Sequence, residues 1–436
     1  MESASTETTS TEAASKETDI ARYARTMNPY WVDVLAMLQL DRPWREARGC
    51  MLIDDAGREY LDATSGFGTA TLGHRSPAVE KALIDHLQTP GVSISTFGWS
   101  SEASKVADTL LRLADADFDK VQFFSAGAEA VEAALKFAAI ATGRRSFLSL
   151  SGGFHGLTGI ATALAGEKFW SDGITTPLEF AETLPSLDPG IVRARLAQGD
   201  VAAVLLEPIQ ASAGSIEQTS EHLAALSDAC RETGTMLIAD EVASGIGRTG
   251  RWFGFHHWRS EFRPDMVVVS KGLTGALLPV SAVLCRNAVF DAVFGKGRAK
   301  IHGATMAGNP MSMACASAVL AEAERIDVCS LAAEGERIFR AAMAEHDPAG
   351  EEFEISGRGL MLAVRTKRVP LMELWVGMRE RNVVMAPAPH RRGTLLMTPP
   401  LIVSAAQLQS IAKHLVEVAR SIVVEPPAPA PVGQPA

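Results

Sequence analysis

The sequence predicts an α/β protein with a large, mostly parallel β-sheet that is covered by helices on both faces. One observation is that short runs apolar at every position alternate with helical stretches, and strands apolar on both sides need cover on both sides. The other is size: the chain has 436 residues, of which 47% are hydrophobic and 21% charged. That is enough for a large domain and a second, smaller one.

The expected strands and helices follow one another in order. Residues 121–124 are a short apolar run, and an Ala-rich helical stretch begins after them at Gly127. Five further apolar runs predict strands, at residues 147–150, 201–208, 236–240, 266–270 and 281–285, with a helix over 221–233. Beyond about residue 321 the pattern changes to a smaller α+β unit, which ends in an amphipathic helix near residues 405–424.

Composition also suggests the domain limits. Residues 1–18 are mostly Ser, Thr, Ala and Glu, and residues 425–436 are mostly Pro and Ala, so we expect a disordered tail at the start and an extended one at the end. Between the tails we expect residues 19–70 and 321–424 to form the small domain, as its N-terminal and C-terminal parts. Residues 71–320 would form the large, ligand-binding domain.

Charge and cysteine usage limit the partners and the location. The net charge of -10 argues against nucleic acid or an anionic membrane as the main partner. The five cysteines are odd in number and contain no C-x-x-C pair, which indicates reduced thiols in the cytoplasm. We see no signal-peptide pattern and no apolar stretch long enough to cross a membrane. His256 and His257 are adjacent and H-E-x-x-H is absent, so no metal site is expected.

Polar residues stand at the ends of predicted strands, where ligands bind in such sheets. Lys271 directly follows the apolar run 266–270. Burying an ammonium is costly, and a lysine whose pKa is lowered by burial becomes a covalent nucleophile. A lysine that extends its amine into solvent is the alternative. Asp240 ends the run 236–240, and helix capping or ordinary ion pairing is its alternative.

Lys271 and Asp240 together fit one requirement. A pyridine ring that acts as an electron sink needs a buried carboxylate to keep its nitrogen protonated. The turn at residues 125–129 supplies Gly127 and free backbone N–H groups at a helix start, which suits a phosphate, although ordinary strand-to-helix turns look alike. The G-x-G-x-x-G match at residues 245–250 is followed by an aromatic stretch and no helix pattern, so a dinucleotide site is not expected.

Seven motifs occur in an order that resembles a known family. They are FFSAGAEAVEAALKFA, SGGFHG, AVLLEPIQ, LIADEVASGIGRTG, PDMVVVSKGL, HGATMAGNP and TPPLIV. Over roughly residues 20–424 the chain is similar to the ornithine/ω-aminotransferases of class III. The resemblance implies the fold-type-I architecture of transferases that depend on pyridoxal 5′-phosphate (PLP), with a seven-stranded type of sheet in the large domain. It also implies a homodimer with a shared active site.

For the catalytic centre, the resemblance implies one lysine and one aspartate. Lys271 would form the Schiff base with PLP, and its freed amine would later carry a proton between substrate and cofactor. Asp240 would pair with the pyridinium nitrogen. His155 and Glu207 match residues expected among the cofactor contacts.

Further cofactor contacts are implied in the same way. Phe154 would stack on one face of the ring, and Val242 would pack on the other. Gly127 and Ala128 would give backbone N–H groups to the phosphate. Thr305 matches the threonine that reaches the phosphate of the neighbouring subunit's cofactor.

The chain departs from the family pattern at the phosphate turn. The family usually reads N-S-G-T-E there, whereas residues 125–129 read Ser-Ala-Gly-Ala-Glu. Two side-chain hydroxyls are missing, and each lost hydrogen bond costs on the order of 1 kcal/mol. We therefore expect weaker retention of PLP, which would depend on backbone amides and Thr305.

Three other departures concern the substrate. Leu396 stands where ornithine-type members have an arginine, Ser212 where they have its glutamate partner, and Ala243 where they have a glutamine. Both halves of one ion pair are missing together, so the usual carboxylate clamp is absent. These places resemble the amine/β-alanine:pyruvate branch of ω-aminotransferases.

In that branch a mobile arginine lies further upstream, close to the place of Arg391 and Arg392. Either could bind a substrate carboxylate, or both could be surface arginines on a loop. Phe67, Phe97 and Trp99 flank segments that line the substrate site in the family, with packing at a dimer interface as the alternative. We expect Phe67 to contact substrate.

The resemblance therefore predicts an aminotransferase that works by a ping-pong aldimine mechanism. Its small-molecule donor would carry a terminal or non-α amine, and its acceptor would be a keto acid or aldehyde. One alternative is a PLP-dependent racemase, aminomutase or decarboxylase of the same family. The other is a homologue that binds PLP poorly and has no catalytic activity.

Overall fold

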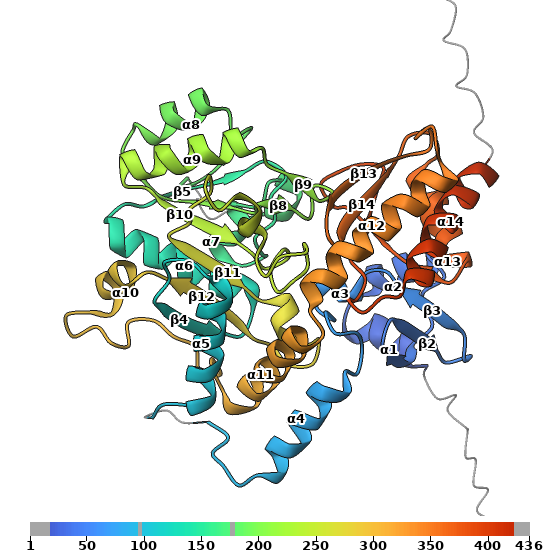
Figure 1. Ribbon diagram of the computed structural model, residues 1–436, viewed down its shortest axis with the longest axis horizontal. Helices are drawn as coiled ribbons and strands as arrows, with labels where there is room; N and C mark the ends of the chain where they lie inside the picture. The colour runs from blue at the N-terminus through green and yellow to red at the C-terminus, as the bar shows by residue number, and fades with distance from the viewer. Residues whose placement is uncertain (1–17, 95–97, 175–178, 423–436) are drawn as a thin grey trace, which may run out of the picture.

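The computed structural model describes residues 18–94, 98–174 and 179–422, with a seven-stranded sheet at the centre of one half (Figure 1). Its strand order is β4-β12-β11-β10-β7-β5-β6. The strands are β4 (Lys120–Phe124), β5 (Ser146–Leu150), β6 (Ala181–Leu184), β7 (Val201–Leu206), β10 (Met236–Asp240), β11 (Met266–Val269) and β12 (Ser281–Cys285). β12 is antiparallel to both neighbours and the other pairs are parallel, which confirms the predicted mostly parallel sheet.

Helices cover both faces of this sheet. Alternate residues of each strand face opposite sides, and because both sides are apolar, both need to be covered. Leu205, Ile238 and Val268 belong to the apolar core on the side of α6 (Gly127–Thr142). Their neighbours Leu206 and Ala239 belong to a second core. Residues of α5 (Ser101–Ala114), α8 (Pro189–Leu196) and α9 (Ser220–Thr233) complete that second core.

The other half of the structure combines the two ends of the chain (Figure 1). One sheet has the order β1-β2-β3-β15, in which β3 pairs in parallel with β15 through Leu61 and Val383. A second has the order β13-β14-β17-β16. This contact between distant segments agrees with a small domain built from both ends, while the boundaries at residues 70, 320 and 424 remain predictions.

Both sheets of this half consist of short strands. They are β1 (Trp44–Arg48), β2 (Met51–Asp54), β3 (Glu59–Asp62), β13 (Phe353–Arg358), β14 (Met361–Thr366), β15 (Val383–Val384), β16 (Ala386–Pro387) and β17 (Thr394–Met397). The helices that pack with them include α12 (Val328–His346), α13 (Leu371–Glu380) and α14 (Ala405–Ser421). Their shared core contains Leu61, Val364 and Leu415.

The remaining elements are short or connect the two halves. The helices are α1 (Asp19–Thr26), α2 (Pro29–Met37), α3 (Ser65–Gly68), α4 (Pro77–Gln88), α7 (Gly159–Ala163), α10 (Asn287–Phe294) and α11 (Pro310–Arg325). Three 3-10 helices are η1 (Lys168–Ser171), η2 (Gly254–Trp258) and η3 (Lys271–Thr274), and a small ribbon joins β8 (Ile209–Gln210) to β9 (Ile216–Glu217). In the part of the chain that the structure describes, no helix is both long and apolar enough to cross a membrane.

The sequence and the structure differ at two points. The edge strand β6 was not predicted, because AETL is neither a continuous apolar run nor a clean alternation. The first predicted tail is one residue too long, since the Thr18 hydroxyl accepts a hydrogen bond from Ala21 N and caps α1. Residues 1–17 and 425–436 of the two predicted tails lie outside the described residues.

The central strand β7 offers a test of this core. Leu205 is fully buried between β7 and α6, so Leu205→Ala should lower the free energy of unfolding by about 2–5 kcal/mol. Leu331→Ala, at a partly exposed position of α12, should cost less than about 1 kcal/mol. Denaturant unfolding of both variants measures the difference, and equal losses would contradict the assigned core.

Candidate active site

The candidate site lies at the carboxyl ends of three neighbouring strands. In the ladder between β10 and β11, Asp240 is opposite Val268. Val268 lies three residues before Lys271, so Asp240 and Lys271 are at the same end of the sheet. Glu207 directly follows β7, which pairs with the other side of β10. The parallel sheet therefore brings Glu207, Asp240 and Lys271 to one edge, as the sequence predicts.

Lys271 is half-buried at the start of η3. Burial is the main cause that lowers the pKa of its amine below the usual lysine value, and the positive charge of Arg248 adds to this. The negative charges of Glu207 and Asp240 act in the opposite direction but do not cancel the effect. More of the amine is therefore unprotonated near neutral pH than in an exposed lysine, and the unprotonated form is the nucleophile.

Asp240 is buried and hydrogen-bonded on both carboxylate oxygens. His155 Nδ1 lies 2.7 Å from Asp240 Oδ2, and Val242 N donates to Oδ1 at 3.1 Å. Burial alone would lower the pKa of His155, but the hydrogen bond and charge of Asp240, with the charge of Glu207, raise it above its usual value. His155 therefore fixes the position of the Asp240 carboxylate and compensates part of its buried charge.

Glu207 is a buried carboxyl group that organises the loop after β5. Its two oxygens accept hydrogen bonds from Phe154 N at 2.9 Å and Ala211 N at 3.1 Å. Burial, with a smaller contribution from Asp240, raises the pKa of Glu207 to about 7, although His155 acts against this. Glu207 thus fixes the backbone that carries the Phe154 ring.

The N-terminus of α6 lies beside this cluster. Its N-cap is Ala126, whose side chain cannot accept a hydrogen bond from the first N–H groups of the helix. A Cβ atom added to Gly127 would come within 3.2 Å of Val242 Cγ1, so glycine lets the turn approach Val242 closely. Gly156 likewise lets Ala128 approach closely, because a Cβ atom added to Gly156 would lie 2.5 Å from Ala128 Cβ.

These residues fit the PLP that the resemblance implies. The buried carboxylate of Asp240 suits a protonated ring nitrogen, and Lys271 offers an amine with a lowered pKa. The start of α6 offers uncapped backbone N–H groups near Val242, where the positive end of the helix dipole favours a phosphate.

Phe154 makes an aromatic contact that the sequence did not predict. Its ring meets the Trp170 ring edge-on, with centroids 5.3 Å apart, and lies 6.3 Å from the His390 ring. Trp170 Nε1 also donates to His390 Nε2 at 2.6 Å. Neither residue ends a strand, and in HRRG the two arginines were weighed while the histidine was not.

Thr305 and Phe67 differ in their surroundings. Thr305 lines a cavity of about 560 Å³ together with Trp99, and none of the strand-end residues lines it. Phe67 is 61% exposed and has a left-handed φ of 57°, which is unusual for a bulky residue. Phe97 lies outside the described residues.

The two candidate arginines differ in their surroundings. Arg391 Nη2 makes an ion pair with Glu354 Oε1 at 3.0 Å, so this guanidinium is held against β13. The Arg392 side chain is exposed, and within the described residues its guanidinium makes no ion pair or hydrogen bond. The ring of the adjacent His390 lies 6.3 Å from the Phe154 ring.

The places of the missing clamp are uncharged in the structure. Leu396 is buried in a small apolar cluster with Ala363 and Ala388. The carbonyl oxygen of Ser212 accepts a hydrogen bond from the backbone N–H of His390 at 3.0 Å. Ser212 is therefore bonded to His390, and neither place carries a charge that could bind a carboxylate.

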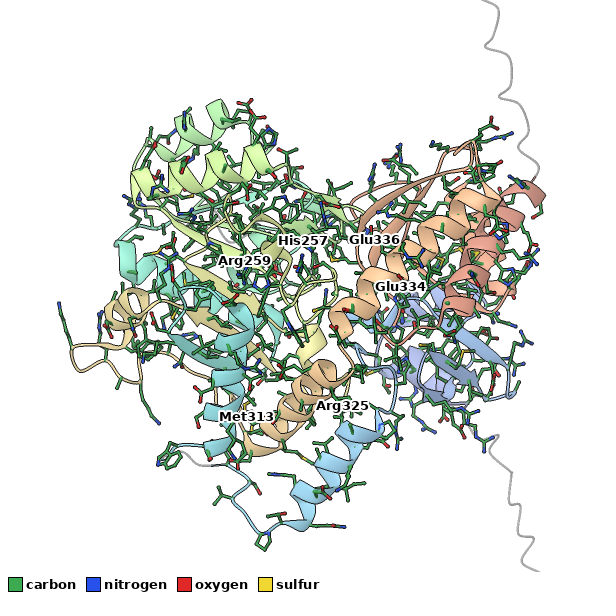
Figure 2. The ribbon with its side chains drawn as sticks, in the orientation of Figure 1. His257, Arg259, Met313, Arg325, Glu334 and Glu336 are labelled. Atoms are coloured by element: carbon green, nitrogen blue, oxygen red, sulfur yellow. The ribbon has the colours of Figure 1, made fainter. Side chains whose placement is uncertain are left out.

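A separate cavity of about 860 Å³ lies between the segment around His257 and the start of α12. Figure 2 labels His257 and Arg259 on one side of it and Glu336 on the other. None of the residues at the strand ends lines this cavity, and Arg259 is already paired with Asp115 at 2.8 Å. It is therefore distinct from the candidate site.

Comparisons with known proteins agree with the geometry. Residues 36–419 match the family model described as "Aminotransferase class-III". The chain is 32% identical to aminotransferase PigE of a Serratia species, over 80% of this chain but only 41% of PigE. It is 33% identical to the acetylornithine aminotransferase of Methanopyrus kandleri, over 72% of this chain and 78% of the relative.

A solved structure gives the same fold. The ornithine aminotransferase from Toxoplasma gondii superposes with a TM-score of 0.80 over 93% of this chain and 99% of that one, at 23% identity. At this identity the likeness concerns the fold alone, and it confirms the fold-type-I architecture.

The buried Glu207 generates a prediction about stability and pH. Its pKa is about 7 in the folded protein and near 4.5 when exposed, so the folded state binds the extra proton in this window. Stability should fall as pH rises from about 4.5 to 7, by up to ~1.4 kcal/mol per pH unit for this one proton. Glu207→Gln should remove that contribution, as measured by urea unfolding at a series of pH values.

Glu221→Gln is the control, because this residue lies exposed in the first turn of α9. It should leave the pH dependence of wild type unchanged. A Glu207→Gln protein with the full wild-type slope would show that Glu207 titrates normally.

Proposed function

Because the chain belongs to the class-III aminotransferase family, we propose that it transfers an amino group from a small amine to an oxo acceptor, with PLP as its cofactor. The observation that carries the proposal is Lys271, whose amine has a lowered pKa beside Asp240 and Glu207. PLP, when bound, supplies an electron sink for the carbon that carries the amine.

Six residues of the candidate site have a proposed task in holding the cofactor. Lys271 Nζ would bind the aldehyde carbon, and Asp240 would keep the ring nitrogen protonated. Phe154 and Val242 would contact the two ring faces. At the start of α6, the backbone N–H groups of Gly127 and Ala128 would bind the phosphate.

Lys271 is also the proposed acid–base group. A lysine with an ordinary pKa holds its proton too tightly to act as a base at neutral pH. Burial lowers the pKa of Lys271, while Glu207 and Asp240 keep the protonated form accessible. The same Nζ atom can therefore take a proton from the substrate carbon and return it.

For the donor, we propose a terminal or non-α amine, as in the amine/β-alanine:pyruvate branch of ω-aminotransferases. The support is the uncharged pair of places at Ser212 and Leu396, together with Ala243. A donor with an α-carboxylate would find no arginine at Leu396. A panel of alanine, glutamate, ornithine, a diamine, a β-amino acid and a simple amine tests this choice.

We further propose a cytoplasmic homodimer that shares its active sites. Thr305 and Trp99 line the same cavity, apart from Lys271, which suits a role toward a second copy. Phe67 would contact substrate from its exposed, left-handed position. All five cysteines are free thiols, as expected of a reducing compartment.

The central role of Lys271 gives a direct prediction. Lys271→Ala should lower kcat at least about 100-fold, because it removes both the covalent attachment and the proton carrier. Lys413→Ala, an exposed position of α14, should keep wild-type turnover. Borohydride treatment of the PLP-loaded wild type should attach the cofactor to the Lys271 peptide.

The readout should be stoichiometric formation of the aminated acceptor, since a racemase or aminomutase would produce none. Normal turnover by Lys271→Ala, or borohydride labelling of another lysine, would overturn the proposed role.

The two loop arginines give a second prediction. We expect the unpaired Arg392 to bind the carboxylate of a keto-acid acceptor, so Arg392→Ala should raise KM for pyruvate about 10-fold or more. KM for an aldehyde acceptor should not change, because it has no carboxylate. Arg391→Ala, which breaks the pair with Glu354, is the matched comparison. An equal change for both acceptors would contradict a carboxylate clamp.

A further inference from the structure

Trp170 and His390 come from distant parts of the chain and share a hydrogen bond. Trp170 belongs to η1, and His390 lies between β16 and β17. Trp170 Nε1 donates to His390 Nε2 at 2.6 Å, and His390 Nδ1 lies 3.0 Å from the carbonyl oxygen of Gly152. An indole nitrogen can only donate, so His390 Nε2 accepts and its Nδ1 carries the hydrogen.

This arrangement uses every ring nitrogen of the pair. The indole N–H and both imidazole nitrogens have partners within the chain. Trp170 and His390 therefore keep no unpaired polar atom for a ligand, and only their aromatic faces and C–H edges remain available. Two residues that often bind polar groups form an apolar surface here.

The surface stands beside the residue that is proposed to stack on PLP. Phe154 contacts both rings, and the Phe154 and Trp170 planes are inclined at 68°. The backbone N–H of His390 is bonded to Ser212, at the place of the missing clamp. Phe169, which is 77% exposed, extends the aromatic surface with its ring 5.0 Å from Trp170.

Charged groups near this surface are few or already paired. Glu167 and Lys168 precede Phe169 and are exposed. Arg391 is held by Glu354, and Arg392 is exposed on the following loop position. Within the described residues, no ion pair or hydrogen bond joins these charged side chains to the Trp170 or His390 ring, and the ring partners of both are aromatic.

We propose that Trp170 and His390 form an aromatic wall of the substrate site, and that the wall selects substrates with an extended apolar chain or ring. The inference rests on the proposed function, which places Phe154 at the cofactor. An alkyl chain that packs on the wall leaves water, and each buried methylene group contributes enough to raise kcat/KM about fourfold. A substrate with a second charge at that position would lose its hydration without gaining a partner.

A chain-length series tests the wall by turnover. With pyruvate as acceptor, primary n-alkylamines from propylamine to heptylamine should show kcat/KM rising about fourfold per methylene in wild type. In Trp170→Ala the rise should fall below about 1.5-fold per methylene. Trp375→Ala is the control for Trp170→Ala, because Trp375 Nε1 makes a similar bond to Met385 O at 2.7 Å elsewhere. It should keep the wild-type series.

A binding series tests the wall without any reaction. The n-alkanols from butanol to octanol cannot be transaminated, and calorimetry should show tighter binding to the PLP-loaded protein with each methylene, with a negative heat-capacity change. Trp170→Ala should abolish this length dependence. His390→Ala should weaken it, whereas His390→Gln should restore it, since glutamine can both accept from Trp170 and donate to Gly152 O.

Together, the two series distinguish a failure of the aromatic wall from a failure of the proposed function. A Trp170→Ala protein that keeps the wild-type length dependence in both series overturns the wall. A wild type that transaminates none of the amines defeats the proposed function, and the alkanols still decide the wall. Circular dichroism checks folding, and if Trp170→Ala does not fold, the comparison of His390→Ala with His390→Gln decides. Equal alkanol binding by those two variants overturns the proposal.

Discussion

The hydrogen bond between His155 Nδ1 and Asp240 Oδ2 is the interaction on which the site depends. It stands at the carboxyl edge of a sheet whose interior is apolar, where an unpaired carboxylate would be very costly. His155 compensates that charge, and Val242 N accounts for the other oxygen. With Asp240 fixed, Lys271 can lie half-buried nearby. The pKa of its amine is lowered, but the charges of Asp240 and Glu207 limit this decrease.

The same edge depends on contacts from the other half of the structure. Arg248 is 2% exposed and donates from Nη1 to the carbonyl oxygens of Leu360 and Pro399. Burial lowers the pKa of Arg248 to about 9, and its charge in turn lowers the pKa of Lys271. His390 also reaches Gly152 from that half. The packing of the two halves therefore adjusts both the electrostatics and the wall beside Phe154.

The sequence predicted the sheet because strands buried on both faces are continuous apolar runs, such as residues 201–206. It predicted Lys271 and Asp240 because both end such runs and match an ordered set of motifs. It could not predict β6, an edge strand without that signal. The Trp170–His390 bond joins residues 220 positions apart. The Arg391–Glu354 pair joins the loop before β17 to β13 and forms only through tertiary packing. Local patterns carry no information on such contacts.

Burial in this fold lowers the pKa of the Lys271 amine and so makes the amine more reactive near neutral pH. The most direct measurement is competitive labelling of the cofactor-free protein with formaldehyde and borohydride over a range of pH, with the modified peptides quantified. Lys271 should become reactive at lower pH than the exposed Lys413, because burial lowers its pKa. If the two lysines gain reactivity at the same pH, burial does not activate Lys271, which contradicts its proposed role.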